Sequence, residues 1–333
     1  MTANRSFKRR VRARAAKTGE SYTAALRHLR TAPRGESMPE NTTMRLSAAQ
    51  LTVQPDPGDT AALHDSGRRI RALMRQAHQA GARLLHLPEG ALACPDKRIM
   101  SATGPDHIGP ADWDRADWPT LTEELRAISG LAAELRLWTV LGSLHPLTPP
   151  HRPHLSLYVI RDDGAVVTRY DERMLSNTKV SHLYTPGSAP VVFTVDGVRF
   201  GCAMGMEAMF PEIFLEYERL DVDCVLFSTH GPGTPVNNGP FALQAQALAA
   251  ANSYPVSYAG TAQDAPNAPS GIISPYGDWL TRCPPEPASA IATADLDLVT
   301  DNPARPWRRV ARSGLYARYQ APDDPRSLDR AHL

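Results

Sequence analysis

The feature that most constrains the fold of this chain is a repeated alternation of short apolar strands with amphipathic helices, from residue 45 to residue 298. Segments 61–81 and 119–135 carry apolar residues at helical spacing, and segments 45–54 and 82–90 read as strands. Such strand–helix units, with hairpins between them, predict an α/β fold in which helices cover a mixed sheet. Periodicity alone leaves open a four-layer αββα sandwich and a three-layer doubly wound fold.

Charge divides the chain into a basic leader and an acidic body. Residues 1–35 hold ten Lys/Arg and one acidic residue, a net charge of +9, and the remaining 26 basic and 34 acidic residues give −8. We expect a basic helical extension and linker over residues 1–43. Residues 5–34 are expected to dock on an acidic surface of the same chain or of a sister subunit, and binding to nucleic acid or another acidic partner is the alternative. The main domain is expected over residues 44–300, followed by an irregular tail over 301–333.

Several classes of protein are disfavoured by what the sequence lacks. No apolar run approaches the ~20 residues that span a bilayer, and no Gly-rich nucleotide-binding loop follows a strand. No cluster has metal-ligand spacing, so neither metal nor cofactor is expected. The four cysteines show no CxxC spacing, which fits a reduced cytoplasmic protein; they are Cys94, Cys202, Cys224 and Cys283.

Three segments carry a family resemblance. They are "LLHLPEG", "RYDERMLSNTKVSHLYTPGS" and "VRFGCAMGMEAMFPE", the last followed by "DCVLFSTHG". In this order and spacing they resemble the nitrilase (carbon–nitrogen hydrolase) superfamily over about residues 45–300. The resemblance implies the four-layer αββα sandwich, at least a homodimer helped by the tail near Trp307, and a Glu–Lys–Cys triad acting on nitriles, amides or carbamoyl groups.

The resemblance assigns the triad positions to residues that depart from the family pattern. Glu89 matches the general base, whereas the lysine position is Glu172 and the nucleophile position is Gly205. A further family glutamate corresponds to Lys179, so Glu172 and Lys179 resemble a reciprocal charge exchange. Glu207, two residues beyond the nucleophile position, is expected to support the turn by hydrogen bonding. Removal of the side chain at 205 is expected to open space in the pocket.

Neighbouring residues complete the expected pocket. Met206 follows the nucleophile position, and His230 and Tyr184 are candidates to face the substrate, although a histidine capping a strand end is equally compatible. Cys202 lies three residues before Gly205, which places it on the opposite face of a regular strand, so we expect a core cysteine. Cys94 lies in a loop after Glu89 that can fold inward.

These residues suggest two functions. In the first, Glu89, Glu172 and Lys179 catalyse acid/base chemistry without a thioester, on a small amide, amidine, nitrile or related C–N compound, and Glu89 needs a raised pKa. In the second, the chain is a pseudoenzyme that serves as a binding or regulatory subunit.

Overall fold

A computed structural model of the chain describes residues 43–231, 239–297 and 304–328. Residues 43–333 form one compact unit, and residues 1–42 belong to another. The basic helical extension expected over residues 1–43 therefore lies almost wholly outside the described residues.

Two six-stranded sheets form the centre of the molecule. Each sheet has parallel central strands and antiparallel outer pairs. The first sheet has the order β12 (Ala290–Asp297), β1 (Thr43–Gln50), β2 (Leu84–His86), β3 (Trp138–His145), β4 (His154–Ile160), β5 (Val166–Asp171). The second has the order β11 (Trp279–Arg282), β10 (Gly271–Ile273), β9 (Val256–Ala259), β8 (Cys224–Ser228), β7 (Val198–Met204), β6 (Val192–Val195).

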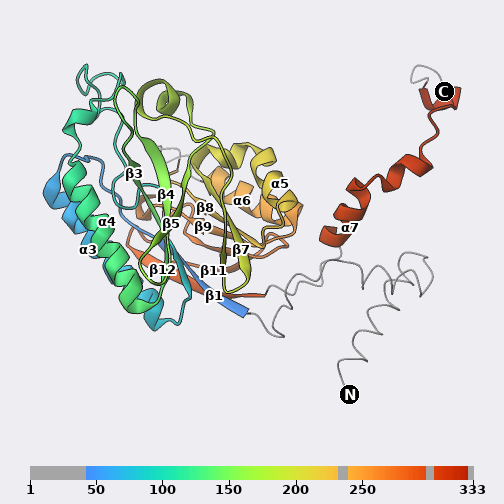
Figure 1. The fold of residues 1–333 in the computed structure, drawn as a ribbon, viewed down its shortest axis with the longest axis horizontal. Coiled ribbons are helices and arrows are strands. Elements are labelled where there is room, and N and C mark those ends of the chain that lie inside the picture. The colour runs from blue at the N-terminus through green and yellow to red at the C-terminus, as the bar shows by residue number, and fades with distance from the viewer. Residues whose placement is uncertain (1–42, 232–238, 298–303, 329–333) are drawn as a thin grey trace. The chain divides into compact units, whose positions relative to one another are not determined.

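Helices cover the outer face of each sheet, as Figure 1 shows. On one side lie α3 (Thr60–Gln79) and α4 (Trp118–Leu135), and on the other α5 (Pro211–Arg219) and α6 (Gly239–Asn252). The layers therefore run helix, sheet, sheet, helix. This arrangement confirms the four-layer αββα sandwich and excludes the three-layer alternative.

The two outer helices of the first sheet begin where the sequence supplies an N-cap. Asp59 accepts a hydrogen bond from the backbone N–H of Ala62 at the start of α3, and Asp117 does the same for Thr120 at the start of α4. The face of α3 that packs on the sheet is the predicted one: it carries Leu63, Ile70, Leu73, Met74 and Ala77, all buried.

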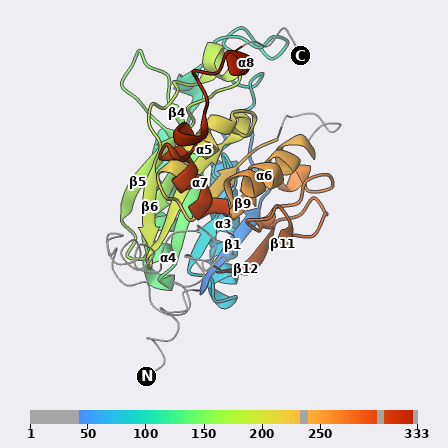
Figure 2. The same ribbon diagram turned by 90° about the vertical axis from the view of Figure 1, so that its right-hand side faces the viewer.

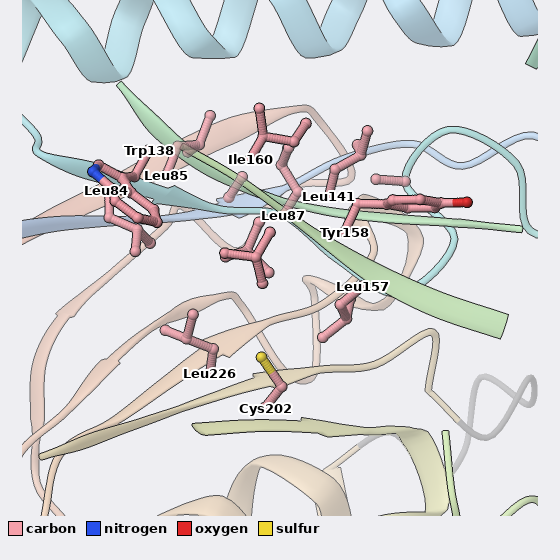
Figure 3. Close-up of a cluster of buried hydrophobic side chains, with 14 of the residues drawn as sticks. Leu84, Leu85, Leu87, Trp138, Leu141, Leu157, Tyr158, Ile160, Cys202 and Leu226 are labelled. Atoms are coloured by element: carbon pink, nitrogen blue, oxygen red, sulfur yellow. The ribbon is translucent and has the colours of Figure 1, made fainter. Parts of the chain in front are cut away.

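The space between the sheets is filled by apolar side chains from both. In Figure 3, Cys202 of β7 and Leu226 of β8 extend toward the first sheet, and Leu157 of β4 extends toward them. Cys202 is fully buried in this core, whereas its neighbour Ala203 packs on the helix side of the sheet. The expectation of a core cysteine at 202 is confirmed. Successive strand residues face opposite sides of a sheet, so Cys202 faces the space between the sheets and Ala203 faces the helices.

The C-terminal segment differs from the irregular tail expected over residues 301–333. It contains helix α7 (Ala304–Arg312), a 3₁₀ turn (Leu315–Tyr319, η5) and the short α8 (Pro325–Leu328), drawn in dark red in Figure 2. Basic residues of α7 bind the end of α5 and the loop after it: Arg305 donates to the carbonyl of Val222, Arg309 pairs with Asp221, and Arg312 pairs with Glu218. This charge complementarity supports a helix where composition alone suggested none.

Among the residues described, no helix combines the length and apolar character that crossing a membrane requires.

Candidate active site

The sequence-predicted triad positions meet where several strands end. Glu89 lies three residues after β2, Glu172 directly after β5, and Gly205 directly after β7. Lys179 begins a single π-helical turn, Lys179–Leu183 (η2). In α/β sheets the carboxyl ends of strands are where loop side chains converge on a ligand. The two sheets thus bring residues far apart in sequence to one place.

The loop that carries Glu89 lies tightly against β3. A Cβ added to Gly142 of β3 would stand 2.1 Å from the carbonyl oxygen of Pro88 and 2.6 Å from the backbone N of Gly90. No side chain fits in that space, so glycine at 142 allows the Glu89 loop to cross the strand. This close approach fixes the backbone on both sides of Glu89.

Lys179 bridges the two glutamates. Its Nζ donates to Glu89 Oε1 at 2.6 Å and to Glu172 Oε2 at 2.7 Å. Both carboxylates are buried and the lysine side chain is 15% exposed. Charge-assisted hydrogen bonds of this kind are the strong ones, and a buried ion pair needs them to offset desolvation. The exchange of charges expected between positions 172 and 179 therefore coincides with a direct contact.

The side-chain-free face of Gly205 is where these groups converge. Gly205 has φ +47°, and a Cβ there would stand 2.8 Å from Glu172 Oε1, 2.9 Å from Glu89 Oε2 and 3.2 Å from Lys179 Nζ. The space expected to open at position 205 is thus occupied by the charged groups themselves. Glu172 Oε1 and Glu89 Oε2 therefore lie near one common point beside the glycine.

Glu172 has one oxygen with no protein partner. Its Oε1 is buried and forms no hydrogen bond with any described residue, whereas Oε2 accepts from Lys179. Burial raises the pKa of Glu172 to about 8; Lys179 opposes this and Glu89 adds to it. Burial by itself lowers the pKa of Lys179, but the two glutamates outweigh it and raise that pKa. The buried environment therefore favours the protonated carboxylic acid at Glu172 and the ammonium at Lys179.

Glu207 holds the backbone next to Glu172 and the backbone next to Gly205. It accepts hydrogen bonds from the hydroxyl of Tyr170 (2.6 Å) and from the backbone N–H groups of Arg173 (2.7 Å), Met174 (3.2 Å) and Met204 (2.8 Å). Two of these donors are adjacent in sequence to Glu172 and Gly205. The structure thus gives Glu207 the turn-supporting contacts that the sequence predicted.

A cavity of about 540 Å³ opens beside Glu89 and Lys179, and the fully buried Glu172 is not among its described lining residues. Glu89, Lys179 and Gly205 line it, and so do the expected pocket residues Met206, Tyr184 and His230. The size suits a small ligand, since such sites typically measure ~300–1,000 Å³. The remaining described residues of the lining are Val53, Pro55, Cys94, Pro95, Asp96, Lys97, Arg98, Ile108, Ser176, Leu183, Gly231, Phe241 and Gln263.

His230 contacts the cluster through its backbone. Its N–H donates to Glu89 Oε2 at 3.3 Å, and its side chain lines the cavity. Asp264 lies beside it: a Cβ on Gly231 would stand 2.5 Å from Asp264 Oδ2. Burial raises the pKa of Asp264, and Glu89 acts in the same direction, while Thr261 and His230 lower it. A second acidic group thus stands close to Glu89, which the sequence did not indicate.

Cys94 is the one cysteine in the described lining, and it is a poor nucleophile. Burial raises the pKa of its thiol far above the ordinary value, and Glu89 adds to this rise. A thiol reacts as the thiolate, so this environment suppresses its reactivity. The loop after Glu89 does fold inward, as one sequence alternative allowed.

Lys97 and Asp264 were not predicted from the sequence, and Cys94 was the only predicted residue of the wall formed by residues 94–98. One signal was present for Lys97, which is one of only two lysines between residues 43 and 333. Asp264 carried no such signal. Within the described parts of the chain, no group of three or more His, Cys, Asp or Glu side chains is arranged to hold a metal ion.

Comparison with known families adds to this geometry. The model of the carbon–nitrogen hydrolase family matches residues 45–306. The chain belongs to this family. It is thus a member of the nitrilase superfamily, and the match spans both sheets, all four covering helices and every residue of the charged cluster. No curated protein matches the chain in sequence.

Solved structures share the fold at low sequence identity. A cysteine-to-alanine mutant of the Nesterenkonia AN1 amidase, from the nitrilase superfamily, has 18% identity and a TM-score of 0.63, with 86% of this chain and 100% of that chain covered. A double mutant of that amidase in complex with acrylamide has 17% identity and a TM-score of 0.61, with 83% of this chain and 100% of that chain covered. A glutamate-to-glutamine mutant, with an acetamide moiety covalently added at its active-site cysteine, has 19% identity and a TM-score of 0.60. Here 83% of this chain and 99% of that chain are covered.

Proposed function

We propose that this protein is an enzyme that cleaves or rearranges a small amide, amidine, nitrile or related C–N compound without forming a thioester. The observation that carries the proposal is the convergence of Glu89, Glu172 and Lys179 on the bare face of Gly205, beside the cavity. A carboxylate and a carboxylic acid held side by side can act as base and acid in one step.

For an amide, the proposed step is a direct attack of water. Glu89 Oε2 accepts a proton from water, the water oxygen bonds to the carbonyl carbon, and negative charge develops on the carbonyl oxygen. The C–N bond then breaks as Glu172 Oε1 donates its proton to the leaving nitrogen. The products are a carboxylic acid and an amine or ammonia, and a proton passing from Glu89 to Glu172 restores the starting state.

Each group has a separate task in this scheme. Glu172 Oε1 is buried without a protein partner among the described residues, and it lies next to the bare face of Gly205, so its proton is available to a substrate atom that reaches this face. Lys179 binds Glu89 Oε1 and Glu172 Oε2, so that Glu89 Oε2, which also accepts from the His230 N–H, and Glu172 Oε1 both lie beside the bare face of Gly205. The backbone N–H of Met206, the first after Gly205, takes by family resemblance the part of stabilising the developing oxyanion.

A panel of small amides, amidines and nitriles tests this proposal. Glu89→Gln preserves the shape of the side chain but removes the base, and we expect kcat/KM to fall by about 10²–10⁴. Glu123→Gln, on the exposed face of α4, makes the same chemical change away from the cavity and should leave turnover intact. Full activity in Glu89→Gln contradicts the proposal.

One observation favours the alternative of a noncatalytic subunit. The charged groups fill the space above Gly205 instead of leaving it open, so the cluster can serve as a rigid binding surface. On this reading ligands raise the melting temperature but no compound of the panel is turned over.

We further propose that the chain forms at least a homodimer and resides in the reducing cytoplasm. Large apolar side chains of the C-terminal segment stay exposed in the single chain, including Trp307 and Val310 of α7. Burying them against a second copy removes apolar surface from water. All four cysteines are free, which suits a reducing compartment.

A further inference from the structure

The lysines of this chain are placed unusually. Arginine supplies nearly all of its positive charge: only four of the 36 basic residues are lysines, and residues 43–333 contain just Lys97 and Lys179. Both line the same cavity. A lysine carries a compact, strongly hydrated charge that suits a confined site, whereas arginine offers a wide planar fork. Lys97 therefore calls for an explanation in terms of the cavity.

The two lysines differ in their partners. Lys179 binds two carboxylates, whereas Lys97 Nζ donates to the hydroxyl of Thr178 at 2.5 Å and has no carboxylate within ion-pair distance among the residues that the structure describes. Burial lowers the pKa of Lys97, and Lys179 lowers it further, with Glu89 and Asp96 opposing. A half-buried ammonium with only a neutral partner is incompletely compensated.

The charged neighbours of Lys97 are engaged elsewhere. Asp96 accepts hydrogen bonds from the backbone N–H groups of Arg98 (2.8 Å) and Ile99 (3.1 Å) and so shapes the turn. The guanidinium of Arg98 donates to the carbonyl oxygens of Pro105 (3.2 Å) and Asp106 (2.7 Å), which ties down the following loop. These backbone contacts fix Asp96 and Arg98 in the loop, whereas Lys97 Nζ has only the hydroxyl of Thr178 as a partner among the described residues.

We propose that Lys97 is a specificity-determining residue that binds a carboxylate of the substrate, so that the substrate is an amide or related C–N compound bearing a free carboxylate. This inference rests on the proposed function for the position of the C–N group, which lies over Gly205. The hydroxyl of Ser176, also in the lining, is a second donor near this wall. Thr178 directly precedes Lys179, which joins the carboxylate subsite to the charged cluster.

The charge balance of the cavity favours a single negative charge on the ligand. Glu89 and Lys179 form an ion pair, and the lining charges Asp96 and Arg98 are hydrogen-bonded to backbone groups of their own loop, whereas Lys97 has no ion-pair partner among the described residues. A carboxylate neutralises it, whereas a neutral ligand leaves the ammonium uncompensated and a dianion brings an excess of negative charge. Burial of the pair strengthens the attraction relative to water.

Matched ligands test this assignment. The probes are the amido acids malonamate, succinamate and glutaramate, each compared with its diamide, in which a neutral amide replaces the carboxylate. Binding to the full chain is measured by isothermal titration calorimetry, and ammonia release is followed in parallel. We expect at least one amido acid to bind about tenfold or more tightly than its diamide, since hydrogen bonds to charged groups contribute this much.

Three variants separate the role of the charge from effects on folding. Lys97→Met should abolish the preference for the amido acid, and Lys97→Arg, which keeps the charge, should retain part of it. Arg75→Met removes one positive charge from the exposed face of α3 and should bind like wild type. The melting temperature of each variant checks that it is folded.

The outcomes distinguish this inference from the proposed function. Equal binding of acid and diamide, a preference that survives in Lys97→Met, or no binding of any amido acid overturns the assignment of Lys97. Carboxylate-dependent binding without ammonia release supports Lys97 and contradicts hydrolysis. Ammonia release from acid and diamide alike, unchanged by Lys97→Met, supports hydrolysis and contradicts the carboxylate subsite.

Discussion

Gly205 combines a left-handed backbone with extreme crowding. Its φ of +47° is a conformation that L side chains rarely adopt, and two carboxylate oxygens and an ammonium surround the place of a Cβ. A side chain at this position must push the charged groups apart. The bare α-carbon and the cluster above it are therefore parts of one arrangement.

Replacement of this glycine tests that dependence. We expect Gly205→Ala to lower the free energy of unfolding by about 2–4 kcal/mol and to abolish turnover, because backbone strain and displacement of Glu172 and Glu89 add together. Gly197→Ala is the matched control: Gly197 has φ +88° but open space around it, so only the strain of about 1–2 kcal/mol remains. Chemical denaturation measures the free energy of unfolding of both variants. An equal decrease in the two would contradict a contribution from crowding at Gly205.

The buried Glu172 links stability to pH. Its pKa is raised to about 8 in the folded protein, so the folded state binds a proton that the unfolded state releases near its ordinary pKa of 4.5. This contribution to stability is fully present below the unfolded pKa and is lost as the pH rises through about 8. We expect the free energy of unfolding to fall by roughly 1–3 kcal/mol over this range.

Glu172→Gln identifies the group responsible. The amide cannot ionise, so denaturant titrations of this variant should show a flatter dependence on pH between the two pKa values. Activity of the wild type should decline as the pH rises through about 8, since Glu172 must hold its proton to act as the proposed acid. An unchanged slope in Glu172→Gln assigns the effect to another group.

At the scale of elements, Glu207 joins the end of β5 to the end of β7. It binds the hydroxyl of Tyr170 within β5 and backbone N–H groups beside Glu172 and Gly205. The two strands belong to different sheets, so this carboxylate fixes how the sheets present the cluster. Its role is one of positioning.

Removal of the Tyr170 hydroxyl, which donates to Glu207, should lower both activity and stability. We expect Tyr170→Phe to cost about 1.5–3 kcal/mol, as for a hydrogen bond to a charged group, and to lower kcat by about tenfold. Tyr254→Phe removes another buried hydroxyl, which donates to the carbonyl of Phe214 at 2.8 Å, and should cost about 1 kcal/mol without changing kcat. If both variants keep full kcat, Glu207 supports folding alone.

The elements themselves follow from sequence periodicity, whereas parts of the site do not. Alternation and helical spacing predicted the strands and helices between residues 45 and 297, a strand end placed Glu89, and the family resemblance assigned Gly205. Lys97 and Asp264 were missed because loop side chains have no periodicity to reveal their direction. Helix α7 was missed because its arginines find partners on α5 and in the loop after it, which lie far away in sequence.

For the whole molecule, the exposed apolar side chains of α7 suggest self-association. We expect sedimentation velocity to show at least a homodimer, and the double variant Trp307→Ser/Val310→Ser to shift it toward the monomer. Val166→Ser, at an exposed position of β5, serves as the control for surface polarity and should not change the mass. A wild-type monomer at micromolar concentration contradicts the proposed assembly.

Intact-mass spectrometry shows whether the proposed reaction proceeds without a covalent acyl intermediate. The full chain is denatured by acid during steady-state turnover of an amide substrate, and the mass of the whole population is recorded. We expect the unmodified mass alone, and full turnover in Cys94→Ala. An acyl adduct that accumulates during turnover and disappears in Cys94→Ala would show that the thiol lining the cavity carries the reaction, contrary to the roles assigned to Glu89 and Glu172.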